Sequence, residues 1–234
     1  MEFRKLKASE IDCRIAQIGA TWLTLLLYKD ARVDMNILDE TVGIMNWQKH
    51  YSRDNANCTV SIWDEEKKQW VEKEDTGTES FSEAEKGLAS DSFKRACFCL
   101  GIGRELYTAP SIFILSRKDM IPKGKESEFY CKNSNESDDS KKRYDTKTRF
   151  WVEYIDYNED REIQNLIIRD NKNNTRFTQL TKEKEKELLE LNQKFLKLDE
   201  EEREEIYKKY QVEDSQRLLI SQLEEIVNDK RRSK

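Results

Sequence analysis

Hydrophobic and polar positions divide the first part of the chain into short elements. β-Branched and aromatic residues dominate residues 21–28, a run too short for an average helix, so we expect a buried strand there. Residues 9–18 and 29–42 are expected to be helical, and Gly43 is expected to end the second helix. Three further strands are predicted, and the charged turn at residues 65–68 joins the last two into a hairpin: residues 47–53, 57–64 and 69–74.

A long helix is predicted to begin at Ser82. Ser82 and Glu85 have the spacing of a capping box, in which two side chains satisfy free backbone N–H groups at the start of a helix. At 100° per residue, apolar side chains cover most of this helix and leave one narrow polar strip. The strip contains Gly87, Asp91, the adjacent cations Lys94 and Arg95, and Phe98. We therefore expect a helix that is buried nearly all round.

The second half of the sequence predicts further strands and then helices. Pro110 and Pro122 bracket a strand at residues 111–116, and the polar residues that follow are expected to form a surface loop or linker at 123–148. Two strands form a second hairpin, with one more strand after it: residues 150–157, 163–169 and 175–180. From Thr181 onward, leucine recurs at helical spacing among Glu and Lys. The prediction is an α+β protein, with an antiparallel sheet packed against helices in a core of residues 1–180 and a charged helical tail at 181–234.

Composition narrows the classes of function. The 234 residues carry a net charge of −5, so any site for a polyanion must be a local basic patch on an acidic protein. No apolar run reaches the roughly 18 residues of a membrane span and the start has no signal-peptide pattern, so we expect a cytoplasmic protein without a membrane partner. The five cysteines lack zinc-ligand spacing and are expected to be reduced, with Cys97 and Cys99 in the core.

The usual signatures of enzymes are missing from the sequence. It contains no phosphate-binding loop for ATP, and Gly101-Ile102-Gly103 closes a helix and lacks the third glycine of a dinucleotide site. His50 is the only histidine, which excludes a histidine-rich metal site. Asp54 with Glu65-x-Lys67 has the residue types of a nuclease metal site, but the Glu-x-Lys pair is expected in a solvated turn. We expect no cofactor, no metal and no enzymatic activity.

Two interpretations of the Lys94 and Arg95 pair remain open. In the first, Asp91 pairs with both cations across one helical turn, a surface interaction worth about a few tenths of a kcal/mol. In the second, a rigid helix holds both cations toward the phosphates of a single strand, and Gly87 leaves room beside them. Such contacts give affinity without sequence preference.

A family resemblance favours the second interpretation. The order of helix, Gly43-x-x-x-Trp47, strand hairpin, Asp75-Thr76-Gly77 and a helix containing ASDSFKRACFCLG resembles the Sak-type single-strand annealing proteins of phages, relatives of the eukaryotic mediator Rad fifty-two. The resemblance covers about residues 28–107 and is most specific at residues 89–101. By similarity, Lys94 and Arg95 occupy the basic pair of the family's inner DNA-binding groove, and Arg32 matches the arginine that joins them. Local charge near strand and helix ends adds three further candidates: Lys49, Arg53 and Arg104.

The resemblance implies a β-β-β-α core, a large homo-oligomeric ring and ATP-independent annealing of single-stranded DNA during homologous recombination and DNA repair in the cytoplasm of a bacterial host. A single-strand binding protein or a phage exonuclease is a further expected partner. Two residues depart from the family: Ile44 replaces an aromatic residue, and Phe98 replaces a further arginine, which makes the groove less basic. The alternative is a protein-interaction module that recruits a single-strand binding protein or a regulator through the helices of residues 181–229.

Overall fold

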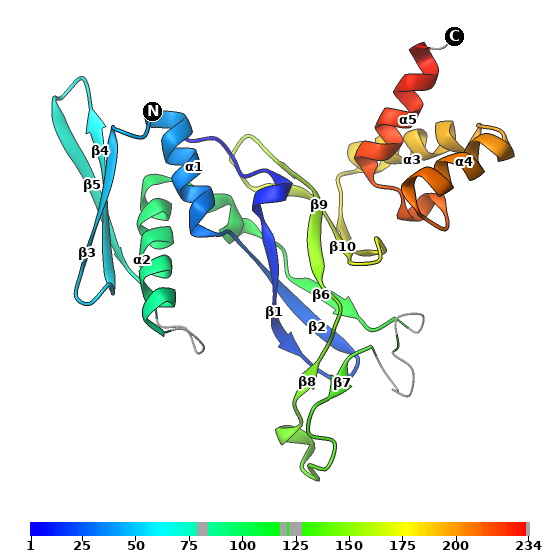
Figure 1. The fold of residues 1–234 in the computed structure, drawn as a ribbon, viewed down its shortest axis with the longest axis horizontal. Coiled ribbons are helices and arrows are strands. Elements are labelled where there is room, and N and C mark those ends of the chain that lie inside the picture. The colour runs from blue at the N-terminus through cyan, green and yellow to red at the C-terminus, as the bar shows by residue number, and fades with distance from the viewer. Residues whose placement is uncertain (79–83, 118–120, 122–127, 233–234) are drawn as a thin grey trace. The chain divides into compact units, whose positions relative to one another are not determined.

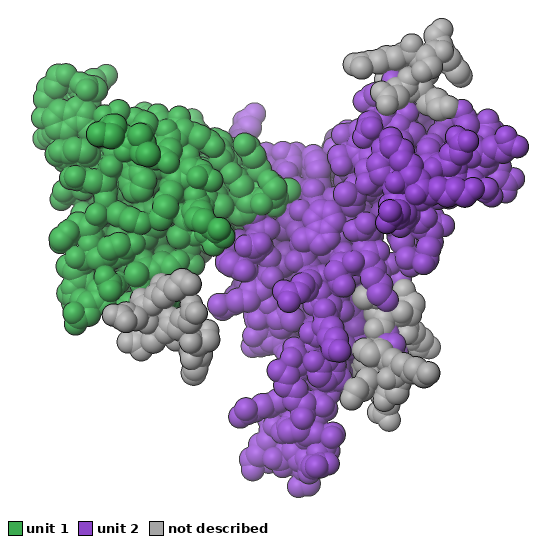
Figure 2. Space-filling model, in the orientation of Figure 1, with its two compact units in different colours: residues 1–10, 29–108 green, residues 11–28, 109–234 purple. Residues whose placement is uncertain are grey.

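The computed structural model describes residues 1–78, 84–117, 121 and 128–232, and it shows an α+β fold with antiparallel sheets and C-terminal helices. The chain divides into two compact units (Figure 1, Figure 2). Unit 1 contains Met1–Glu10 and Lys29–Thr108, and unit 2 contains Ile11–Tyr28 and Ala109–Lys234. This division differs from the boundary at residue 180 that composition suggested, because the first two strands of the chain pair with strands that follow unit 1 in the sequence.

Unit 1 has the expected β-β-β-α arrangement. Its three-stranded antiparallel sheet has the order β3-β4-β5, and both of its helices pack on one face of that sheet (Figure 1). The elements are α1 (Ala31–Val42), β3 (Trp47–Ser52), β4 (Asn57–Asp64), β5 (Gln69–Thr76), α2 (Ala84–Leu100) and two 3₁₀ turns at Ala8–Glu10 and Arg104–Thr108. The predicted helix at residues 29–42 and the three predicted strands are confirmed.

Local chemistry explains where these elements begin and end. The Asp30 side chain caps α1 by accepting the N–H of Arg32, and Gly43 ends the helix with a φ of 86°, which favours glycine. Ser82 lies outside the described residues, so the predicted capping box is not tested. On the sheet face toward the helices, the Trp47 ring stacks on Phe93 of α2 at 6.2 Å between centroids. The predicted core position of Cys97 is confirmed, whereas Cys99 is only half-buried.

Unit 2 is built on a six-stranded antiparallel sheet in the order β11-β10-β9-β1-β2-β6. The two end strands, β11 and β6, contact each other, so the sheet curls around an apolar core of side chains such as Leu23, Ile114, Leu166 and Ile168. Its strands are β1 (Asp12–Ile18), β2 (Trp22–Tyr28), β6 (Ile112–Leu115), β9 (Phe150–Tyr157), β10 (Ile163–Asp170) and β11 (Thr175–Gln179).

The predicted helix at residues 9–18 is wrong. Residues 12–18 form strand β1, which pairs along its length with β2. The register shifts between Ile15 and Gln17, so a bulge breaks the apolar alternation that would have indicated a strand. Pairing with β2 therefore overrides the local pattern.

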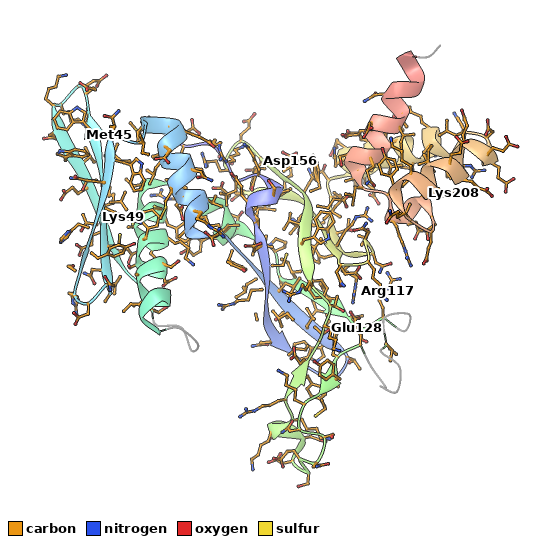
Figure 3. The ribbon with its side chains drawn as sticks, viewed as in Figure 1. Met45, Lys49, Arg117, Glu128, Asp156 and Lys208 are labelled. Atoms are coloured by element: carbon orange, nitrogen blue, oxygen red, sulfur yellow. The ribbon has the colours of Figure 1, made fainter. Side chains whose placement is uncertain are left out.

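The polar segment after β6 is more ordered than expected in its described part. Strands β7 (Tyr130–Cys131) and β8 (Tyr144–Asp145) pair with each other, and a 3₁₀ turn at Asp139–Lys141 lies between them. Next to this hairpin, Glu128 is buried and forms an ion pair with Arg176, which also contacts Asp170 at 3.1 Å (Figure 3). The segment is therefore anchored to the sheet of unit 2 by buried charges.

Three helices follow the sheet: α3 (Lys182–Leu196), α4 (Glu200–Tyr210) and α5 (Ile220–Arg232), with a 3₁₀ turn at Ser215–Arg217. They enclose a small apolar cluster of Phe195, Leu218, Leu223 and Ile226. Arg169 of β10 connects this cluster to the sheet. Its guanidinium donates to the carbonyl oxygens of Gln216 at 2.7 Å and Leu218 at 3.0 Å, and it pairs with Glu153.

Candidate nucleic-acid interface

All six candidate cations lie in unit 1, but the structure gives them different environments. Arg32 lies in the first turn of α1 and is 83% exposed. Its Nε donates to a carboxylate oxygen of Asp30 at 2.9 Å, while its backbone N–H donates to the same oxygen at 2.8 Å. These bonds hold the pKa of Asp30 below its usual value. Arg32 is therefore oriented by its own helix cap and still accessible.

Lys94 of α2 lies close to the same end of α1. Its positive charge contributes to lowering the pKa of Asp30 and opposes the upward shift of the Asp34 pKa. Within the part of the chain that the structure describes, Lys94 forms no hydrogen bond or ion pair. Arg32 and Lys94, which belong to two helices, therefore both act on Asp30 at the start of α1.

Arg95 turns toward the sheet. Its Nε lies 3.6 Å from a carboxylate oxygen of Asp75 on β5, and this nitrogen has no hydrogen-bond partner among the described residues, while 42% of the side chain is exposed. Asp91 accepts hydrogen bonds from the backbone N–H and the hydroxyl of Thr78, at 2.9 and 3.2 Å. The pairing of Asp91 with Lys94 and Arg95 that the sequence left open is therefore not formed among the described residues.

Lys49 does not lie on an open surface. It occupies the sheet face that packs against α2 (Figure 3), and its ammonium lies 4.5 Å from the centre of the Phe93 ring. This contact is a cation–π interaction between strand and helix. Lys49 is half-buried and thus contributes to the packing of the β-β-β-α unit.

Arg53 and Arg104 differ from each other as well. Arg53 is exposed in the turn between β3 and β4, with a φ of 50°. Arg104 donates to the carbonyl oxygens of Phe98 at 2.6 Å and Cys99 at 2.8 Å, in the last turn of α2. Free carbonyls at a helix C-terminus favour a cation, so Arg104 acts as a cap of α2.

A buried ion pair supports the two helices, and sequence reasoning missed it. Lys29 and Asp34 are both almost fully buried, and the Lys29 ammonium lies 4.4 Å from the centre of the Phe98 ring of α2. Burial raises the pKa of Asp34 to about 6 in spite of Lys29. One signal was present in the sequence: Asp34 shares the apolar face of α1 with Ile37 and Leu38.

Comparisons with known proteins identify no relative of this chain. The sequence matches no protein-family model, and comparisons with curated proteins and with solved structures give no significant match. Among the described residues, no cluster of acidic, cysteine and histidine side chains could hold a metal ion. No helix in the same residues is both long and apolar enough to cross a bilayer.

Proposed function

We propose that this protein binds single-stranded DNA through Arg32, Lys94 and Arg95 of unit 1 and anneals complementary strands, as an oligomeric ring and without ATP or metal. One observation supports the site most directly: Arg32 and Lys94, from two helices, both lie near Asp30, and among the described residues Asp91 does not pair with Lys94. Arg95 follows Lys94 in the sequence and is half-exposed. The carboxylate that it lies beside, Asp75, belongs to β5 and not to α2.

The chemistry of these residues suits annealing. Guanidinium and ammonium groups bind phosphates of any sequence, so a strand is held by its backbone. The bases then remain free to pair, and base pairing supplies the driving force. The acids Asp30 and Asp75 reduce the local charge, which favours a binding strength that lets strands realign.

The test is an annealing assay without nucleotide and in the presence of a chelator. Wild type is compared with Arg32→Ala and with the double variant Lys94→Ala/Arg95→Ala, and annealing is followed by fluorescence quenching between labelled complementary oligonucleotides. The matched control is Lys67→Ala/Lys68→Ala, which removes an adjacent exposed pair of cations from the β4–β5 turn. We expect annealing by wild type and by the control, and a loss of tenfold or more in the site variants.

Either of two results would contradict this proposal. Unchanged annealing by the Lys94/Arg95 double variant removes the site, and absence of annealing by the wild type removes the function. A circular-dichroism melt of each variant separates loss of binding from loss of folding.

A second candidate function concerns the C-terminal helices. Leu189 and Leu196, seven residues apart on α3, are 56% and 46% exposed, which is an apolar stripe of the kind that docks a partner helix. Such a module would recruit a single-strand binding protein or a regulator. Salt distinguishes the two functions, because binding to phosphates weakens steeply as salt rises, whereas an apolar helix contact does not.

A further inference from the structure

The sheet of unit 2 opens between two strands that are neighbours in its order. Strands β1 and β9 pair only where Asp12 meets Trp151. On its β9 side, therefore, the segment from Cys13 to Ile18 has no partner strand among the described residues. Backbone N–H and C=O groups on such an edge are available to a strand from another chain.

A cationic cleft lies along this open edge. Its volume is about 840 Å³, and its walls are formed by the start of β1, Tyr28 and residues 146–151. Arg14, Lys147 and Arg149 line it and are exposed, and none of them forms an ion pair with a described residue. Asp12 is the one carboxylate in the lining, so the cleft has an excess of positive charge in a chain whose net charge is −5.

The three-stranded sheet of unit 1 has a free edge of the opposite charge. Strand β5 is an outer strand and exposes most of its side chains. Among the described residues, the hydrogen-bond donors to the two glutamates of β5 are neutral side chains: Ser61 for Glu72, and Asn57 and Thr59 for Glu74, on which the charge of Arg53 also acts. Their charges are thus not compensated by these contacts. The other outer strand, β3, carries Lys49 and His50 and would not complement a cationic cleft.

We propose that β5 of one copy of this protein adds to the open edge of β1 in a second copy, inside the cationic cleft. Backbone hydrogen bonds join the two edges over Cys13 to Ile15, before the bulge turns β1 away. Glu72 and Glu74 then face the cations of the cleft. The surfaces differ, so the contact is head-to-tail, and repeating it with a closing rotation gives a ring. This inference rests on the oligomer of the proposed function and names its interface.

Charge reversal tests the contact. The cleft variant is Arg14→Glu/Lys147→Glu/Arg149→Glu, and the strand variant is Glu72→Lys/Glu74→Lys. The control variant is Lys172→Glu/Lys186→Glu/Lys208→Glu, which reverses three exposed cations elsewhere in unit 2. Sedimentation velocity at low salt measures the assembly of each variant. We expect the cleft and strand variants to weaken association by tenfold or more, and the control variant to assemble like wild type.

Mixing the variants distinguishes a broken contact from a damaged fold. Each variant has one unchanged and one reversed surface, and the other variant carries the complement of both, so an equal mixture should assemble although neither variant does so alone. A chain with all five substitutions reverses both surfaces and should assemble again. Assembly of both single-surface variants at wild-type concentrations overturns the interface and leaves the annealing proposal intact, whereas a monomeric wild type overturns both. If the cleft variant assembles normally but loses affinity for oligo(dT), the cleft holds nucleic acid and the proposed contact is wrong.

Discussion

At the scale of single residues, the buried pair of Lys29 and Asp34 sets the conditions under which the site is formed. The second oxygen of Asp34 has no hydrogen-bond partner in the described structure, although the residue is fully buried. Taking this carboxylate out of water is what raises its pKa to about 6, from an ordinary value of 3.8. The folded protein therefore binds a proton at Asp34 more readily than the unfolded chain does.

This raised pKa predicts a pH dependence with a definite sign. Between pH 4 and pH 6 the folded state holds more protons at Asp34 than the unfolded state, so this residue's contribution to the free energy of unfolding falls as pH rises. The difference between wild type and Asp34→Asn in the free energy of unfolding should change by about 2 kcal/mol across this window. Urea unfolding of both proteins at pH 4 and pH 7 measures it, and parallel curves for the two proteins would contradict the prediction.

Gly103 is the second residue whose effect is predictable. It has a φ of 75°, and a Cβ there would lie 2.4 Å from Cε of the buried Lys29. Gly101 has a φ of 102° but open space around it. Gly103→Ala should therefore destabilise the protein by about 1–3 kcal/mol more than Gly101→Ala, because both strain the backbone and only the first overpacks. Thermal unfolding of the two variants gives the difference, and equal losses would exclude the close contact.

At the scale of elements, predictability follows the range of the interactions that define each element. Helix α1 and the β4–β5 hairpin were predicted because Asp30, Gly43 and the turn at residues 65–68 act locally. Strand β1 was missed because its pairing with β2 and its bulge decide its conformation.

The candidate site follows the same rule. The sequence identified Lys94 and Arg95 and offered Asp91 as their neighbour in the helix. It could not show that Asp75, on a distant strand, lies beside Arg95, or that Thr78 binds Asp91. The half-buried position of Lys49 also depends on contacts between elements, because its partner Phe93 is 44 residues away in the chain. The charge pattern of the sequence therefore predicted which cations belong to the candidate site, but not which side chains from other elements they contact.

The role of Arg104 gives a prediction at this scale. Because its guanidinium caps the last turn of α2, Arg104→Ala should lower the free energy of unfolding by about 1 kcal/mol. The affinity of the Arg104→Ala variant for oligo(dT) at fixed salt should stay within twofold of that of wild type. Lys94→Ala should show the reverse, with weaker binding and nearly unchanged stability. Fluorescence anisotropy and urea unfolding on the same preparations compare them, and a loss of affinity in Arg104→Ala would place this residue at the DNA.

At the scale of the whole molecule, an acidic chain that binds DNA as we propose has to do so through a few positions. Its net charge of −5 opposes DNA at long range, so binding depends on local cations and on salt. Each phosphate contact with a single strand contributes about 0.7 to the slope of log affinity against log salt concentration.

The slope of log affinity against log salt concentration measures how many phosphate contacts the proposed site makes. Lys94→Ala/Arg95→Ala should reduce the slope for oligo(dT) by about 1.4, since two phosphate contacts are lost. The Lys67→Ala/Lys68→Ala control should leave the slope unchanged, because these cations already pair with Asp64 and Glu65 in their own turn. Titrations at four salt concentrations are sufficient, and an unaltered slope in the first variant would mean that neither cation touches the strand.

Arg169 has a consequence for how the last third of the chain behaves. Its guanidinium is nearly buried, and it is shared between strand β10 and the turn before α5, while Glu153 beside it also accepts the backbone N–H of Ile220 at 2.7 Å. Undocking the helices would break the hydrogen bonds that these two charged groups make with Gln216, Leu218 and Ile220, and each bond to a charged group contributes about 1.5–3 kcal/mol. The C-terminal region is therefore no loosely tethered tail: limited proteolysis should not release it while the sheet is intact, and calorimetry should show both melting in one cooperative transition.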